Sequence, residues 1–195
     1  AGGRLVFTYT KMKCGGAPKK VALLTEDRLR TQQRRGDFEF VYFQNEKTLM
    51  KPKVYGDRLA AIYAARGIKA HYLHRLAAID TRARRAVFHR LPEASTKPLP
   101  AGHALEKIEV DFDFLHFMPP MAAPDFVRQS TLTSDEERPK GGWVTVDKHT
   151  LVHTRHPNVV SLGDVAGTPA SKTGAAIRMQ APDRKSTRLN SSHLV

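Results

Sequence analysis

Apolar and polar positions in the first half of the chain predict strands and helices in alternation. Three short runs of apolar, β-branched or aromatic residues predict buried strands: 4–8, 38–43 and 68–73. Between them we expect one helix from Pro18 to a stop at Gly36, and another over 57–66 that Gly67 closes. Alternating strands and helices are typical of a parallel sheet with helical crossovers, so the pattern predicts an α/β nucleotide-binding architecture.

The pattern changes in the second half. We expect strands over 84–89 and 105–112, whereas three prolines exclude regular structure over 115–124. Short apolar runs then predict a small hairpin, a strand that leads into Gly163 and a final helix: 143–146 with 151–153, 159–162, and 172–180. No window approaches 18 uninterrupted apolar residues, which excludes a membrane-spanning helix.

Charge is distributed unevenly between the two halves. The net charge of +13 falls entirely in residues 1–90, because residues 91–195 hold 12 basic and 12 acidic side chains. The basic residues are scattered through amphipathic segments, a distribution that a solvated face explains as well as a binding patch does. One cysteine in 195 residues excludes an internal disulfide framework and a cysteine-rich zinc module. We expect no metal site either, because a strand-like pattern separates His149, His153 and His156.

The single cysteine is the strongest candidate for chemistry. Cys14 lies between a predicted strand and a predicted helix, where backbone N–H groups and the positive end of the helix dipole favour a thiolate. Four lysines add positive charge nearby: Lys11, Lys13, Lys19 and Lys20. These features favour a nucleophilic or redox-active sulfur over a buried structural one. Gly15-Gly16 occupies the predicted strand-to-helix turn, where a dinucleotide-binding domain would place its phosphate-binding glycines, but the G-x-G-x-x-G spacing is absent.

A second constellation spans residues 157–182. Asp164 directly follows a predicted buried strand, and a loop of Gly, Pro and Ser then leads into an Ala-rich helix. The aspartate can accept hydrogen bonds from ribityl hydroxyls, and the helix start can present N–H groups with small side chains around them. This arrangement predicts a site for a phosphate-bearing cofactor.

Four separated segments, in order and spacing, resemble sulfide:quinone oxidoreductases of the mitochondrial type (type II), a branch of the flavin disulfide-reductase superfamily. They are KCGGAPKK, DFLHFMPPMAAPDF, GGWVTVDKHTLVHTRHPNVVSLGD and TPASKTGAAIRMQAP. The resemblance implies an α/β, three-layer fold with a parallel sheet. It implies a Rossmann-like (FAD/NAD(P)-binding) domain over 1–114 and, over 115–182, the returning segment of a second FAD-binding domain.

The resemblance also implies roles for individual residues. Cys14 matches the redox cysteine beside the flavin, and Lys20 matches a lysine near that sulfur. Asp164 matches the flavin-binding aspartate, and Lys172 is placed to approach the flavin. The helix start that contacts FAD is matched by four residues: Gly174, Ala175, Ala176 and Ile177.

The family reaction that this resemblance implies needs more than the chain provides. Sulfide attacks a sulfur link between two cysteines, the sulfane sulfur is carried as a persulfide to a small acceptor, and electrons pass through FAD to quinone. A flavin fingerprint before Ala1, a second cysteine and membrane-docking helices are not in the sequence. Residues 183–195 resemble a translated sequencing adapter, so we expect a non-native tail there. We expect 1–182 to be an internal fragment that is inactive alone.

The implied parent is a peripheral protein of the mitochondrial inner membrane or the bacterial cytoplasmic membrane. Two related flavoproteins are alternatives: a flavocytochrome-type sulfide dehydrogenase and a type II NADH dehydrogenase, the latter disfavoured by the missing glycine motif. An alternative of another class is a basic module that binds RNA or anionic lipid. We expect no nucleic-acid partner. The lysines around Cys14 are explained by stabilisation of a thiolate, and the remaining positive charge does not require a nucleic acid to explain it.

Overall fold

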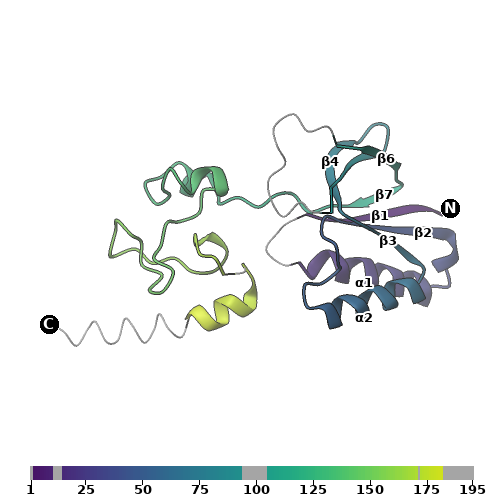
Figure 1. Cartoon of the computed structure of the whole chain (residues 1–195), viewed down its shortest axis with the longest axis horizontal. Coiled ribbons are helices and arrows are strands. Elements are labelled where there is room, and N and C mark those ends of the chain that lie inside the picture. The colour runs from purple at the N-terminus through teal and green to yellow at the C-terminus, as the bar shows by residue number, and fades with distance from the viewer. Residues whose placement is uncertain (1, 11–14, 94–104, 171, 182–195) are drawn as a thin grey trace. The chain divides into compact units, whose positions relative to one another are not determined.

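The computed structural model describes residues 2–10, 15–93, 105–170 and 172–181 (Figure 1). Contacts divide the chain into two compact units, Ala1–Pro120 and Met121–Val195. Within the described residues, no helix has the length and apolar character needed to cross a bilayer.

The first unit is built on a parallel sheet with the strand order β3-β2-β1-β7. These strands are β1 (Gly3–Tyr9), β2 (Phe38–Gln44), β3 (Ile68–Tyr72) and β7 (Phe114–His116). Helices α1 (Ala17–Thr31) and α2 (Lys53–Ala65) cover one face, as Figure 1 shows. An antiparallel sheet covers the other: β4 (His74–Asp80), β5 (Arg85–Arg90) and β6 (Lys107–Asp111). The α/β fold with a parallel sheet in three layers is thus confirmed.

Alternating side chains of the central strands supply two cores. Phe7 and Phe40 stack at 5.7 Å on the helical face, where Tyr63 of α2 also packs. Val6 and Val41 point to the opposite face and pack with Phe88 of β5. Because a strand between two layers buries both faces, β1 and β2 are apolar almost throughout, which is why their runs are conspicuous in the sequence.

Four local features of this unit differ from what the sequence predicts. Helix α2 begins at Lys53, four residues before the expected start at residue 57. Helix α1 ends at Thr31 instead of continuing to Gly36, because Gln33 adopts a left-handed φ of +57°. The Gln33 and Arg34 N–H groups then donate to the Arg30 and Leu29 carbonyls at 3.0 and 2.8 Å, which closes the helix without a glycine. The sequence did not predict β4, which was assigned to no element. It also excluded regular structure from 115–124, where β7 includes the first two residues.

The pairing of β7 with β1 places residues 114–116 in the first unit of the chain. Leu5, Val6 and Phe7 of β1 pair in register with β7, so Phe114–His116 lie in the first unit. The predicted division after residue 114 falls inside this strand.

The described residues of the second unit, 121–170 and 172–181, have little regular structure. They contain α3 (Asp125–Arg128), two short 3-10 segments at η2 (Arg138–Lys140) and η3 (Gly163–Val165), and helical residues 174–181. The expected hairpin is reduced to one antiparallel bridge between Val146 and His153, and the expected strand 159–162 to a bridge between Val152 and Val160. Bridges and loop hydrogen bonds surround a small core of five residues: Ala123, Val127, Val144, Val146 and Ala166.

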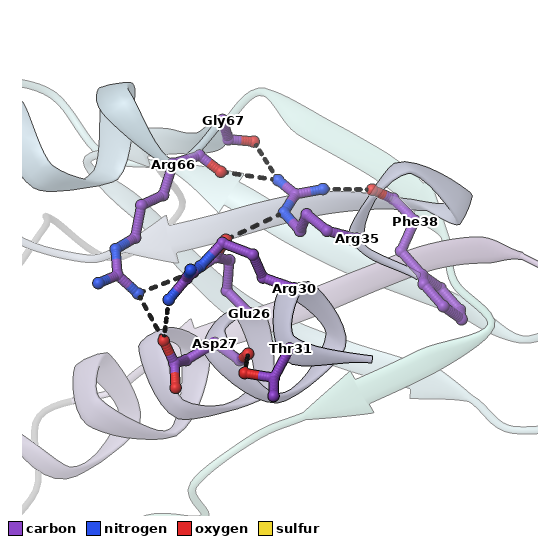
Figure 2. A network of polar contacts seen from close by, with 8 residues as sticks. All are labelled: Glu26, Asp27, Arg30, Thr31, Arg35, Phe38, Arg66 and Gly67. Atoms are coloured by element: carbon purple, nitrogen blue, oxygen red, sulfur yellow. Dashed lines mark hydrogen bonds and ion pairs between the residues drawn. The ribbon is translucent and has the colours of Figure 1, made fainter. Parts of the chain in front are cut away.

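A buried carboxylate connects the helices of the first unit (Figure 2). Glu26 of α1 is 2% exposed, and its Oε2 lies 2.8 Å from Nη1 of Arg66, the residue that ends α2. Its Oε1 lies 3.6 Å from Nε of Arg35, which in turn donates to three carbonyls: Phe38, Arg66 and Gly67. This network ties α1 to the residues that precede β2 and β3, at the edge of the sheet where the parallel strands begin.

Replacing Glu26 by glutamine is expected to lower the free energy of unfolding by about 2 kcal/mol. Three arginines would lose a carboxylate that lies out of water, although their own partial exposure reduces the cost below that of a fully buried pair. Asp27→Asn is the matched control, because Asp27 is 48% exposed and should change stability by less than about 0.5 kcal/mol. Equal urea midpoints for the two variants would contradict this role for Glu26.

Partial desolvation of one histidine predicts a pH dependence of stability. His71 is exposed in β3, but its ring stacks on Phe43 at 4.9 Å, and this partial desolvation, followed by the nearby His74 and Lys69, lowers the pKa of His71. Because the unfolded chain then binds the proton more readily, this contribution is complete above the ordinary histidine pKa of about 6.5 and is lost as the pH falls. We expect the urea midpoint to drop less between about pH 7.5 and 5.5 in His71→Phe than in the parent chain. An equal drop would contradict the expectation.

Candidate functional site

Cys14 lies outside the described residues, and so do Lys11 and Lys13. The predicted strand and helix do flank this segment, since β1 ends at Tyr9 and α1 begins at Ala17. The role of Cys14 therefore stays a prediction, supported by the features that the structure describes on the two sides of it.

The start of α1 carries a positive end without acidic neighbours. Gly16 is the N-cap and provides no side-chain cap, and the first turn contains no acidic residue. The partial positive charge of the helix start is therefore not reduced by a carboxylate of the first turn. A positive helix start would favour a thiolate at Cys14, which stays a prediction.

Lys19, rather than Lys20, is folded against the turn that follows Cys14. Its side chain is buried, its Nζ donates to the Gly15 carbonyl at 2.6 Å, and it lies 4.0 Å from the centre of the Tyr9 ring. Lys20 is exposed. Its role near the sulfur stays a prediction. The sequence held no signal that distinguishes the two lysines, because Lys20 has the same four-residue spacing from Gly16 as Lys19 has from Gly15.

Asp164 lies in a turn that backbone hydrogen bonds fix in place. Gly163, which begins η3, has a φ of +71°, a conformation that favours glycine. On the other side of Asp164, the Val144 N–H donates to the Val165 carbonyl at 2.9 Å, and the Gly167 N–H donates to the Val144 carbonyl at 2.8 Å. The carboxylate is thus carried on a short loop held by backbone hydrogen bonds, and the strand expected before it is reduced to the bridge at Val160.

The helix over 174–181 begins with small residues that leave its first N–H groups accessible. Gly174 and Ala175 are exposed, whereas Ala176 and Ile177 are half-buried. The Thr173 Oγ1 and carbonyl accept from the Ala176 and Ile177 N–H groups, both at 3.2 Å. Among the hydrogen bonds between described residues, the Gly174 and Ala175 N–H groups have no acceptor. A Cβ added to Gly174 would meet no atom within 4 Å, so there is open space beside it.

The structure brings the Asp164 turn and this helix together. A Cβ added to Gly163 would lie 2.8 Å from the Ile177 side chain, so the turn packs directly on the helix. The Gly163 N–H also donates to the Gln180 Oε1 at 2.9 Å. Sequence reasoning missed Gln180, because nothing in its spacing indicates a tertiary contact with a glycine before the helix.

Lys172 is held beside the same turn. Its Nζ donates to the Ala166 carbonyl at 2.5 Å and lies 4.0 Å from the centre of the Trp143 ring. Burial lowers the pKa of Lys172, and the negative charges of Asp164 and Glu137 oppose this shift. The ammonium therefore stabilises the loop after Asp164 from within the unit, whatever else it contacts.

His153 of the second unit has ordinary structural contacts. His153 is buried, and its Nε2 lies 3.0 Å from the Leu132 carbonyl. Its Nδ1 accepts from the Arg155 and His156 N–H groups at 3.0 and 3.1 Å. Both ring nitrogens of this residue are therefore engaged within the protein.

Known proteins are similar to this chain along most of its length. The chain is 33% identical over 180 residues to the mitochondrial sulfide:quinone oxidoreductase of Mus musculus, and 34% identical over 184 and 183 residues to those of Schizosaccharomyces pombe and Dictyostelium discoideum. These matches cover 91 to 93% of the chain and 37% of each relative, so the chain spans little more than a third of their length. No family model matches.

Solved structures show the same fold at low sequence identity. The sulfide:quinone oxidoreductase of Aquifex aeolicus has a TM-score of 0.74 and 16% identity, over 98% of this chain and 44% of that one. The NDH2 of Plasmodium falciparum has a TM-score of 0.63 and 11% identity, over 85% and 32%. The flavoprotein disulfide reductase RclA of Escherichia coli has a TM-score of 0.61 and 15% identity, over 96% and 36%. The resemblance found in the sequence is confirmed over the matched stretch.

Proposed function

We propose that this chain is part of a flavin-dependent oxidoreductase that oxidises sulfide to sulfane sulfur and passes two electrons through FAD to quinone. The observation that carries the proposal is the contact of the Asp164 turn with the helix over 174–181, in a chain similar to sulfide:quinone oxidoreductases. Because the chain spans 37% of those relatives, we infer that it is a fragment and is inactive alone.

The residues present fit FAD. Open space beside Gly174 and two N–H groups without an acceptor among the described residues suit an anionic oxygen, which the helix start favours electrostatically. We assign the Gly174 and Ala175 N–H groups to this contact, while Ala176 and Ile177, whose own N–H groups donate to Thr173, would lie beside it. Asp164 would accept hydrogen bonds from ribityl hydroxyls, and Lys172 would add a positive charge near them. When bound, FAD supplies the two-electron relay between sulfide and quinone.

The chain's own chemistry centres on Cys14. As a thiolate, it is the nucleophile that thiol–disulfide exchange requires, and the start of α1 stabilises that charge. Lys19 fixes the turn after the cysteine through Gly15, and Lys20 supplies a further cation near the sulfur. The chain contains one cysteine, so a second redox sulfur would come from sequence beyond it.

The remaining partners follow from this assignment. Sulfide is the reductant, quinone the electron acceptor, and a small nucleophile the acceptor of the sulfane sulfur. We place the parent protein at the surface of the mitochondrial inner membrane or the bacterial cytoplasmic membrane, where quinone is dissolved. The basic residues of 1–90 would favour an anionic surface.

The electron donor distinguishes this proposal from its closest alternative. The parent protein, expressed from its complete reading frame, is expected to reduce a soluble quinone analogue with sulfide and not with NADH. A preference for NADH would instead support a type II NADH dehydrogenase and would overturn the proposal.

A further inference from the structure

One hydrogen bond joins a turn and a helix that the sequence separates by 17 residues. The Gly163 N–H donates to the Gln180 Oε1 at 2.9 Å. The left-handed φ of Gly163 fixes the direction of this N–H, and the Ile177 side chain closes the space where a Cβ would lie. Gly163, the residue directly before Asp164, is therefore held on the helix over 174–181 by one polar contact with Gln180 and one apolar contact with Ile177.

Gln180 acts at a distance from the start of the helix. It shares the inward face with Ala176 and Ile177, which are half-buried, whereas Gly174 and Ala175 are exposed. Gln180 follows Gly174 by six positions, which corresponds to about 9 Å along a helix axis. The Gln180 backbone therefore lies away from a group bound at the helix start, and its side-chain oxygen accepts from the Gly163 N–H, so Gln180 acts through Gly163.

We propose that Gln180 is a positioning residue that fixes Asp164 relative to the start of helix 174–181. This inference rests on the proposed function, in which Asp164 and the helix start hold two parts of the same FAD molecule. A ligand that contacts two elements binds more tightly when their spacing is set before binding. Without the Gln180 oxygen, the Gly163 N–H loses its acceptor and the turn is free to move on the helix.

Substitutions that separate the acceptor oxygen from side-chain size test this role in the complete protein. Gln180→Met keeps the length and removes the oxygen, and is expected to raise the dissociation constant for FAD about tenfold. Gln180→Glu keeps an oxygen acceptor and is expected to recover most of that affinity. Gln129→Met is the matched control, because Gln129 is an exposed glutamine of the same unit, and it should leave FAD affinity unchanged.

Hydrogen exchange at Gly163 gives a second measurement that needs neither flavin nor activity. In the chain as it stands, the Gly163 amide should exchange about tenfold faster in Gln180→Met than in the parent, and Gln180→Glu should restore its protection. Unchanged exchange and FAD affinity in Gln180→Met would overturn the inference, as would equal losses in both Gln180 variants. A complete parent protein that binds no FAD would overturn the proposed function as well, which distinguishes the two failures.

Discussion

Cys14→Ser in the complete protein should lower sulfide-dependent quinone reduction by about three orders of magnitude or more. Serine is nearly isosteric with cysteine, but its hydroxyl is not ionised near neutral pH and cannot replace the thiolate. Because Cys14 is the single cysteine of this chain, the substitution removes every thiol that the chain contributes to the site. The measurement is the steady-state rate with sulfide and a soluble quinone.

Flavin content separates a chemical effect of this substitution from a structural one. Cys14→Ser should retain FAD, since the residues assigned to the cofactor lie in the second unit, at Asp164 and over 174–177. Ser161→Ala, which changes a buried hydroxyl of that unit, is a control that should keep most of the activity. Wild-type turnover in Cys14→Ser would contradict the assignment of this residue.

Asp164→Ala is expected to weaken FAD binding by about a hundredfold. The loss follows from the removal of a charged acceptor that is carried on a fixed turn. On one side of Asp164, the Gly163 N–H donates to Gln180 of the helix, and on the other side the Val165 carbonyl accepts from the Val144 N–H. Asp164→Asn should give an intermediate affinity, because its amide oxygen still accepts hydrogen bonds but carries no charge. Fluorescence titration of the apoprotein with FAD measures the three affinities.

An aspartate elsewhere in the second unit provides the control. Asp125→Ala removes an exposed carboxylate at the start of α3, and should leave FAD affinity unchanged. Equal affinities in Asp164→Ala and Asp125→Ala would remove Asp164 from the cofactor site.

The fold was predictable where burial determines the sequence directly. Strands β1 and β2 lie between two layers, so both faces are apolar and their runs are easily recognised. Strand β4 begins with the buried His74 and continues with exposed and half-buried residues, a pattern that carries no comparable signal. The end of α1 was misplaced because Gln33 takes the left-handed conformation that sequence reasoning assigns to glycine.

The candidate site was predictable as a set of segments and not as a set of contacts. Its segment around Asp164 was identified from residue types that suit a cofactor. The contact of Gln180 with Gly163 depends on how the chain folds back on itself, and the contact of Lys19 with Gly15 depends on which of two adjacent lysines turns toward that carbonyl. No local pattern separates Lys19 from its neighbour Lys20, or marks Gln180 among the polar residues of its helix.

Anaerobic addition of sulfide to the complete, purified protein tests the central claim most directly. The claim predicts a yellow protein whose flavin absorbance near 450 nm is bleached by sulfide and recovers when quinone is added. In Cys14→Ser the same flavin should be present but should not be bleached at a comparable rate. A colourless protein, or a flavin that sulfide does not reduce, would contradict the claim.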